Sequence, residues 1–242
     1  MLSNLYQNTV LKNPKSIFLL LVITLLSFGY FTKDFRLDAS SETLLIKGDP
    51  DLEYLKEINK RYGSKEFLIL TYTPIEGMVT ESSINNLLSL KYKIQSLDWV
   101  HNVVTLLDVP LLSNSEAPLQ ERLESFKTLK DEDVDKERGF QEILNSPVFR
   151  NFVISEDGNT SGIIVYIKKN DLKNIENKSK KEIEDYKNSI KKKNHTNILQ
   201  IREVIKSYNN VGKIYLGGIP MIADDMMSFI KSDIIVFGLG VL

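Results

Sequence analysis

Apolar residues are unevenly distributed along the chain, and a long stretch without charge lies between Lys15 and Lys33. This stretch, residues 16–32, reads SIFLLLVITLLSFGYFT and is 17 residues long. A helix rises about 1.5 Å per residue, so this length just crosses the roughly 30 Å hydrocarbon core of a bilayer. Tyr30 and Phe31 suit the outer interface, where aromatic residues are enriched. The pattern predicts a transmembrane helix over residues 16–32.

Two other interpretations of this run stay open, a cleaved signal peptide and a buried helix of a soluble protein. A signal peptide usually ends in small residues, whereas this run ends in the bulky Phe28-Gly29-Tyr30-Phe31, so we favour a retained helix. Lys12 and Lys15 precede the run, and the first 15 residues contain no acid. The positive-inside rule then gives a slight preference for residues 1–15 as a cytoplasmic amino terminus.

The carboxyl end of the chain is also apolar, since residues 234–242 read IIVFGLGVL. Nine residues are too few to cross a bilayer. We expect a second transmembrane helix that is truncated within this sequence, and a short buried strand or helix is the alternative. Pro220 suits a first helical turn, and apolar residues recur at helical spacing after it. We therefore predict one helix over residues 220–242 that leads into the second span.

Charged residues indicate where this last helix enters the membrane. Asp224, Asp225, Lys231 and Asp233 would each cost roughly 2.5 to 3.5 kcal/mol at mid-membrane, so only the part after Asp233 should lie in the bilayer. The adjacent acids Asp224 and Asp225 could share a proton or bind a cation, but we favour capping of the helix start, because acids stabilise that end of a helix dipole. The preceding pair Gly217-Gly218 would act as a hinge.

Between the two apolar ends, the first half of residues 33–219 alternates between helix and strand patterns. Asp49 and Pro50 suit an N-cap and a first helical position, and Gly63 suits a stop. A β-rich run follows over residues 67–73. Thr80 can cap a helix that ends near Leu97. A second strand over residues 99–107, ended near Pro110, leaves room for a right-handed crossover between parallel strands.

The second half begins with an irregular insertion over residues 111–159. We expect helices near residues 119–129 and 134–145, and then a short strand at residues 152–154. Glu156-Asp157-Gly158-Asn159 is a turn signal that predicts a hairpin with the strand over residues 160–168.

A long basic segment follows the third strand. Residues 168–193 carry ten lysines and five acids with a thin apolar stripe. We favour a solvated amphipathic helix over a basic contact surface, because charge runs usually face water. The helical period continues to Asn209, and a fourth strand covers residues 213–216. Two strand-helix-strand halves predict an α+β domain of the ferredoxin-like, split βαβ class with an inserted helical segment. We expect a shared sheet on which the following residues are partly or wholly buried: Leu68, Leu70, Val104, Leu106, Ile164 and Tyr166.

The composition of the chain excludes several kinds of binding site and reaction. The 31 basic and 32 acidic residues give a net charge of -1, which speaks against nucleic acid as a partner, and the absence of cysteine excludes disulfides and thiolate chemistry. His101 and His195 have no second ligand at metal spacing, so each is interpreted as a surface or interface histidine. The sequence contains no phosphate loop, nucleophile elbow or HExxH motif. We predict no enzyme activity, no cofactor, and no catalytic or metal-binding residue.

Several short motifs occur in the order typical of one family of membrane proteins. They are Arg36-Leu37-Asp38-Ala39-Ser40 before Leu44-Leu45, Asp49-Pro50, Tyr62-Gly63, Val153-Ile154-Ser155-Glu156-Asp157-Gly158, and Gly217-Gly218-Ile219-Pro220 through Asp224-Asp225. In this order, together with the short first span, the chain resembles the amino-terminal part of resistance-nodulation-division (RND) exporters, nearest the MmpL-like and hopanoid-transporter-like branch. Each motif is loose, and only their order along the chain is specific.

The resemblance implies a periplasmic, porter-type domain over residues 33–219 in a multi-pass protein of the inner membrane. It also implies proton-driven export of hydrophobic or lipid-like substrates, with the proton relay on later helices outside this sequence. The implied partners are the bilayer, the remaining helices and second porter loop, the substrate and, as an open option, further copies of the protein. A sensor region of a two-span receptor and a membrane-anchored binding domain are the alternatives, since fold analogy alone does not fix function.

Overall fold

The computed structural model describes residues 12–31, 48–62, 66–112, 126–168 and 179–241. The chain divides into two units, residues 1–38 and residues 39–242. The first unit contains helix α2, Pro14–Phe31, in which no residue is buried. Among the described helices, α2 is the one long and apolar enough to cross a membrane, which also suits a signal sequence. The predicted span over residues 16–32 is therefore a helix, apart from Thr32, which lies outside the described residues.

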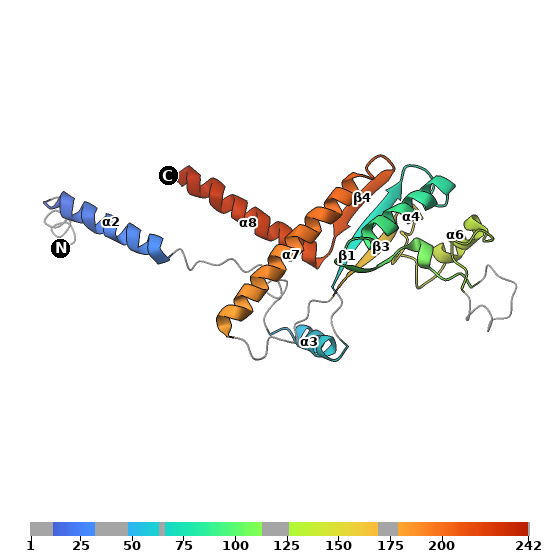
Figure 1. Cartoon of the computed structure of the whole chain (residues 1–242), viewed down its shortest axis with the longest axis horizontal. Coiled ribbons are helices and arrows are strands. Elements are labelled where there is room, and N and C mark those ends of the chain that lie inside the picture. The colour runs from blue at the N-terminus through green and yellow to red at the C-terminus, as the bar shows by residue number, and fades with distance from the viewer. Residues whose placement is uncertain (1–11, 32–47, 63–65, 113–125, 169–178, 242) are drawn as a thin grey trace. The chain divides into compact units, whose positions relative to one another are not determined.

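The second unit is an α+β domain built on a four-stranded sheet (Figure 1). The strands are β1 (Phe67–Pro74), β2 (Val100–Val104), β3 (Ser161–Ile167) and β4 (Gly212–Gly217). Their order across the sheet is β2-β3-β1-β4, and each neighbouring pair is antiparallel. Strands β1 and β2 run in the same direction, as expected, but they are not neighbours because β3 lies between them.

Two helices cover one face of this sheet. Helix α4, Glu81–Gln95, connects β1 to β2, and helix α7, Lys180–Lys206, precedes β4; the two helices contact each other. Thr80 caps α4 as predicted, because its side chain accepts a hydrogen bond from the Ser83 backbone N–H. The core between the layers is made of fully buried apolar side chains: Leu68 and Leu70 from β1, Leu90 and Ile94 from α4, Ile163 and Val165 from β3, and Ile198 and Ile201 from α7.

The predicted burial is confirmed for β1 and β3, although Ile164 and Tyr166 lie on the less buried face of β3. Leu68 and Leu70 are fully buried. In β3, however, Ile163 and Val165 are buried, whereas Ile164 and Tyr166 are only partly buried. Ile164 pairs with Ile69, which is exposed on the other face of the sheet. Both alternating sets of β3 are apolar, so the pattern could not decide which set faces the helices.

The second strand is shorter than predicted. It ends at Val104, and Leu106–Asp108 form the 3-10 turn η4. Thr105 and Asp108 stabilise this turn as a capping box, which offers the backbone an alternative to the sheet ladder. Leu106 is buried as expected, but it lies on this turn and not on the sheet. Val104 is partly buried on β2.

The insertion contains helix α6, Lys136–Leu144, which confirms the helix predicted near residues 134–145. Most of the other predicted helix, residues 119–129, lies outside the described residues. Its described end is not helical, because Lys127 forms an isolated bridge with Leu111 and a turn follows. The bridge gives the backbone hydrogen bonds that a helix would otherwise supply.

The predicted hairpin before β3 consists of the turn and a single bridge between its two arms. Residues 152–154 form no strand, but Ile154 makes an isolated antiparallel bridge with Ser161. Gly158 in the connecting turn has a φ of 73°. The side chain of Ser155 donates a hydrogen bond to Asp157, as does the backbone N–H of Asn159, and these bonds lower the pKa of Asp157 to about 2. The turn is therefore fixed by local polar contacts.

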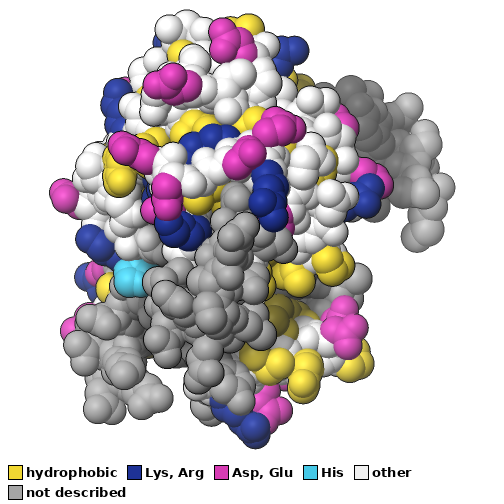
Figure 2. All heavy atoms as spheres, turned by 90° about the vertical axis from the view of Figure 1, so that its right-hand side faces the viewer, with side chains coloured by type: hydrophobic (Ala, Val, Ile, Leu, Met, Phe, Trp, Pro, Cys, Tyr) yellow, Lys and Arg dark blue, Asp and Glu magenta, His cyan; other side chains and the backbone are white. Residues whose placement is uncertain are grey.

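One further helix precedes the first strand along the chain, and another follows the last strand. Helix α3, Pro50–Tyr62, starts where Asp49 accepts a hydrogen bond from the Asp51 backbone N–H, so the predicted start is confirmed. The predicted stop, Gly63, lies outside the described residues. Helix α8, Ile219–Val241, is continuous and confirms the helix predicted from Pro220 into the apolar end. Figure 2 views the molecule from the side where α6 lies in Figure 1, and on this face acidic and basic side chains are interspersed.

Candidate functional site

Three polar contacts join helix α8 to helix α7, and they include most of the residues singled out in the sequence. Asn194 on α7 donates a hydrogen bond from Nδ2 to the carbonyl oxygen of Pro220 at 2.9 Å. His195, the next residue, places Nδ1 3.0 Å from both carboxylate oxygens of Asp224. Two turns further along α7, Arg202 donates from Nη2 to both oxygens of Asp225 at 2.9 and 2.8 Å. We call this set of contacts the α7–α8 junction.

The two adjacent acids of α8 have different surroundings within the junction. Asp224 is 8% exposed, and its partner His195 keeps a side-chain exposure of 49%. Asp225 is more accessible to solvent than Asp224, at 26%, and its partner Arg202 is 43% exposed. Neighbouring residues on a helix point about 100° apart, so the two carboxylates reach different residues of α7. The buried acid has a hydrogen-bond partner, as burial of a carboxylate requires.

The interpretation of Asp224 and Asp225 as helix caps is wrong. The first turn of α8 contains no acid, because the helix begins at Ile219 and the two acids come after that turn. Each acid instead pairs with a side chain of α7. Among the described residues no group of three or more potential ligands could hold a metal ion, so the pair does not gather a cation site there.

The two histidines are not brought together into one site. His195 lies at a helix interface, in agreement with its interpretation as an interface residue. His101 is an exposed residue of β2 whose carbonyl oxygen accepts a hydrogen bond from Gln95 Nε2 at 3.2 Å. The sequence signal that points to the junction is the seven-residue spacing of His195 and Arg202, which puts both on one side of α7.

The glycine pair before α8 forms a packed turn. Gly217 is the last residue of β4 and pairs with Ile69. Gly218 has a φ of +117°, and a Cβ there would lie 3.1 Å from the carbonyl oxygen of Phe67 and 3.2 Å from Cα of Leu68. Glycine is required at this position by its backbone conformation and by close packing. In this structure the pair forms a closely packed turn, and its role as a hinge stays a prediction.

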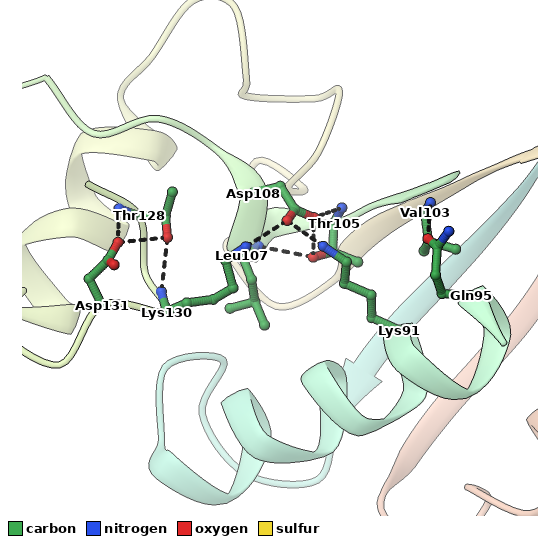
Figure 3. Close-up of polar contacts among 9 residues, drawn as sticks. All are labelled: Lys91, Gln95, Val103, Thr105, Leu107, Asp108, Thr128, Lys130 and Asp131. Carbon is green, nitrogen blue, oxygen red and sulfur yellow. Dashed lines mark hydrogen bonds and ion pairs between the residues drawn. The ribbon is translucent and has the colours of Figure 1, made fainter. Parts of the chain in front are cut away.

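A second polar cluster, which sequence reasoning missed, attaches the insertion to α4 (Figure 3). Asp108 on η4 forms ion pairs with Lys91 from α4 and with Lys130 from the insertion, the latter at 3.0 Å. Lys91 is only 13% exposed and Asp108 19%. Partial burial raises the pKa of Asp108, but the contacts with Lys91, Lys130 and the Thr105 backbone N–H outweigh it, so the pKa lies below its ordinary value.

The cluster is built from two copies of one local motif. Thr105-Leu106-Leu107-Asp108 and Thr128-Leu129-Lys130-Asp131 both read Thr-Leu-x-Asp. In each copy the threonine backbone N–H donates to the aspartate, at 2.8 Å in the first and 2.6 Å in the second, and the threonine hydroxyl donates to the same oxygen. Lys130 of the second copy reaches Asp108 of the first. The repeat of Thr-Leu-x-Asp was the available sequence signal.

The Asp108 cluster and the α7–α8 junction differ in the segments that they hold together. The Asp108 cluster fixes an internal segment and, with net charges that balance, offers no surplus charge for a ligand. The α7–α8 junction lies where the domain passes into a helix that ends in an uncharged apolar run. It is therefore the arrangement that can transmit movement, and we take it as the candidate functional site.

Comparison of the chain with protein-family models gave no match, and a search of curated proteins gave none either.

Proposed function

We propose that this chain is the amino-terminal part of a proton-driven exporter of the RND type, with hydrophobic or lipid-like cargo. In this proposal α2 crosses the inner membrane, the end of α8 enters it as the start of a second span, and the α+β unit is a ferredoxin-like, porter-type domain in the periplasm. The domain forms part of the substrate path, and the proton relay belongs to later helices. Its contribution is to couple substrate passage to movement of the membrane helices.

One observation carries this proposal, the continuity of α8. The helix runs without a break from Ile219 to Val241. Its first turns are tied to α7 by the junction and packed on the core through Met221. Residues 234–240 near its end are apolar and exposed. A rigid helix with one end held by a folded domain and the other suited to a bilayer transmits displacement between them.

The sheet supports the porter-type assignment. The strand order β2-β3-β1-β4, with α4 after β1 and α7 before β4 on one face, fits a split βαβ arrangement. The insertion lies between β2 and β3. Such folds host many functions, so the argument for export rests on the placement between two apolar helices together with the sequence resemblance.

The location of the domain is testable with a single cysteine, because residues 1–242 contain none and any cysteine elsewhere in the full-length protein can be replaced by serine. Glu76 is exposed in the loop between β1 and α4. We expect a Glu76→Cys variant of the full-length protein to react with a membrane-impermeant maleimide applied to cells with a permeabilised outer membrane. A cytoplasmic location, seen as labelling only after the inner membrane is opened, would refute the proposal.

Coupling through α8 is tested by breaking the junction. In cells that carry the full-length protein, the double substitution Asp224→Ala and Asp225→Ala should abolish efflux of a lipophilic dye while protein level and membrane insertion stay normal. Glu76→Ala removes an exposed acid outside the junction and should leave efflux unchanged. Normal efflux by the double variant would contradict coupling through α8, and absence of efflux by the unmodified protein would favour the sensor alternative.

A further inference from the structure

The two edge strands of the sheet differ in how their outer backbone groups are bonded. The order β2-β3-β1-β4 leaves β2 and β4 each with a neighbouring strand on one side only. An edge strand presents a row of N–H and C=O groups that the sheet does not pair. These groups bind water, a side chain or a further strand, because a backbone group left unpaired away from water costs about as much as a lost hydrogen bond.

The outer edge of β2 is closed by one side chain. Gln95, the last residue of α4, accepts a hydrogen bond at Oε1 from the backbone N–H of Val103 at 2.8 Å (Figure 3). Its Nε2 donates to the carbonyl oxygen of His101 at 3.2 Å. His101 and Val103 are alternate residues of β2, so the side-chain amide of Gln95 bonds to this edge as a peptide group of a neighbouring strand would.

The hydrogen-bond pattern shows which backbone groups of β4 face outward. The backbone N–H of Ile75 donates to the carbonyl oxygen of Val211. Bonded pairs alternate along antiparallel strands, so the residues that bond to β1 are Lys213, Tyr215 and Gly217. The intervening residues direct their N–H and C=O groups away from β1, and they are Gly212, Ile214 and Leu216. Within the part of the chain that the structure describes, no hydrogen bond reaches these outward groups.

One charge and one aromatic ring lie beside this outer edge. Lys213 and Tyr215 are exposed, Tyr215 at 66%, and they alternate with the buried Ile214. Lys213 is the single charged residue within residues 207–223, and residues 67–75 of the neighbouring segment carry no charge. The outer edge of β4 therefore combines outward-facing backbone groups with one positive charge.

The acids around β4 do not neutralise Lys213. Glu66 and Glu76 lie just beyond residues 67–75, and Glu203 is an exposed residue of α7. Asp224 and Asp225 follow β4 along the chain, but they pair with α7 in the junction. Lys213 forms no ion pair with any described residue.

We propose that the outer edge of β4 binds an extended segment of another polypeptide, which adds to the sheet as a fifth, antiparallel strand with an acidic side chain opposite Lys213. In this mode of recognition main-chain hydrogen bonds supply affinity, and alternate side chains supply specificity. Antiparallel addition places the residue opposite Tyr215 two positions before the residue opposite Lys213. The segment therefore carries an aromatic or β-branched residue, then any residue, then an acid. The inference does not depend on export.

A second copy of the chain fits this edge less well. Strand β4 reads GKIYLG and contains no acid, so pairing of β4 with its own copy would leave Lys213 without an opposite charge. Lysine on an edge strand also disfavours the addition of apolar or basic strands. The residue that protects this edge from unspecific pairing thus selects an acidic partner.

The test uses the solubilised full-length protein and a fluorescently labelled peptide, Thr-Val-Tyr-Val-Glu-Val-Thr. Its tyrosine and glutamate would lie opposite Tyr215 and Lys213. We expect saturable binding in fluorescence anisotropy, and slower hydrogen exchange at the backbone N–H groups of Ile214 and Leu216 when the peptide is bound. N-methylation of the central valine removes an N–H that faces β4 and should abolish binding. N-methylation of the tyrosine, whose N–H faces away, should preserve it.

Charge reversal tests the chemistry of the partner. Lys213→Glu should weaken binding of the peptide about fivefold, and replacing the glutamate of the peptide by lysine should restore it, because opposite charges attract across paired strands and like charges repel. Lys187→Glu, at an exposed lysine of α7, is the matched control and should change nothing. Hydrogen exchange at Val103, which Gln95 already binds, should be the same with and without the peptide.

Three results would overturn the inference. Absence of saturable binding, or binding that survives N-methylation of the central valine, would show that the edge does not add a strand. Binding that neither charge reversal changes would remove the acidic partner. Protection of Ile214 and Leu216 that rises with protein concentration in the absence of peptide would assign the edge to a second copy. None of these measurements involves efflux, so their failure is distinguishable from failure of the proposed function.

Discussion

The Asp108 cluster and the α7–α8 junction both join elements through charged side chains, but they differ in the number of partners that each acid has. Asp108 accepts from two lysines and from a capped turn, and Lys91 is nearly buried. In the junction each acid has one partner on α7; Asp224 is buried, but His195, Arg202 and Asp225 keep substantial exposure. Shared contacts fix a segment in one position, whereas a separate, solvated pair such as Arg202 and Asp225 can be exchanged at little cost.

The difference suits the two locations. The turn that carries Asp108 and the adjoining part of the insertion belong to the core cluster, with Leu106, Leu107, Leu111 and Leu129 almost fully buried. The junction lies where α8 leaves the domain, and a coupling element must be able to move. Four predictions test this contrast, each with unfolding of the solubilised protein followed by the fluorescence of Trp99, the single tryptophan of this sequence, which is buried just before β2.

The largest effect is expected at Leu106, which is 1% exposed in the turn that carries Asp108. Leu106→Ala should lower the free energy of unfolding by about 2 to 5 kcal/mol, because it removes buried apolar surface and leaves a cavity. Leu199→Ala on the exposed side of α7 is the matched control and should change it by less than about 1 kcal/mol. Equal effects at both positions would mean that the insertion is not part of the rigid core.

A smaller loss is expected for Asp108→Asn. It removes the charge that pairs with Lys91 and Lys130 and weakens the capping of η4, so the free energy of unfolding at pH 7 should fall by about 1 to 3 kcal/mol. Asp133→Asn, which breaks an exposed pair with Lys127, should give no measurable change. If the two variants unfold alike, the shielding of the Asp108 cluster has no energetic consequence.

The pH dependence of unfolding of the Asp108→Asn variant shows whether the charge of Asp108 stabilises the folded protein. The folded-state pKa of Asp108 is lowered, so its contribution is present above the ordinary carboxyl pKa of about 3.9 and is lost as the pH falls through the folded value. The gap in unfolding free energy between the unmodified protein and Asp108→Asn should be constant near neutral pH and shrink below about pH 4. A gap that widens on acidification would contradict the ion-pair assignment.

The smallest effect is expected in the junction. A double-mutant cycle of Arg202→Ala and Asp225→Ala should give a coupling free energy of about 0.2 to 1 kcal/mol, because both side chains are partly solvated. The coupling should decrease with added salt. A value as large as the effect of Asp108→Asn would remove the contrast between a fixed cluster and an adjustable junction.

Local sequence signals predicted the elements of this protein well. Asp49, Pro50 and Thr80 placed two helix starts correctly, because capping depends on side chains within three residues of the cap. The apolar period after Pro220 predicted the continuous α8. The sequence also singled out Asp224, Asp225 and His195 of the junction, but it did not indicate their pairing or the part of Arg202.

Contacts between distant residues required the tertiary structure. In β3 both alternating sets are apolar, so the side that meets α4 and α7 was decided by packing. The position of β3 between β1 and β2 depends on pairing across about a hundred residues, for which the sequence holds no local signal. Aspartate is a common helix-capping residue, so the sequence alone favoured that role for Asp224 and Asp225. Only the packing of α7 against α8 shows that they pair with His195 and Arg202. The sequence by itself determined which segments are helix, strand or apolar, because these preferences are set within a few residues, and the folded chain decided which faces and charges meet.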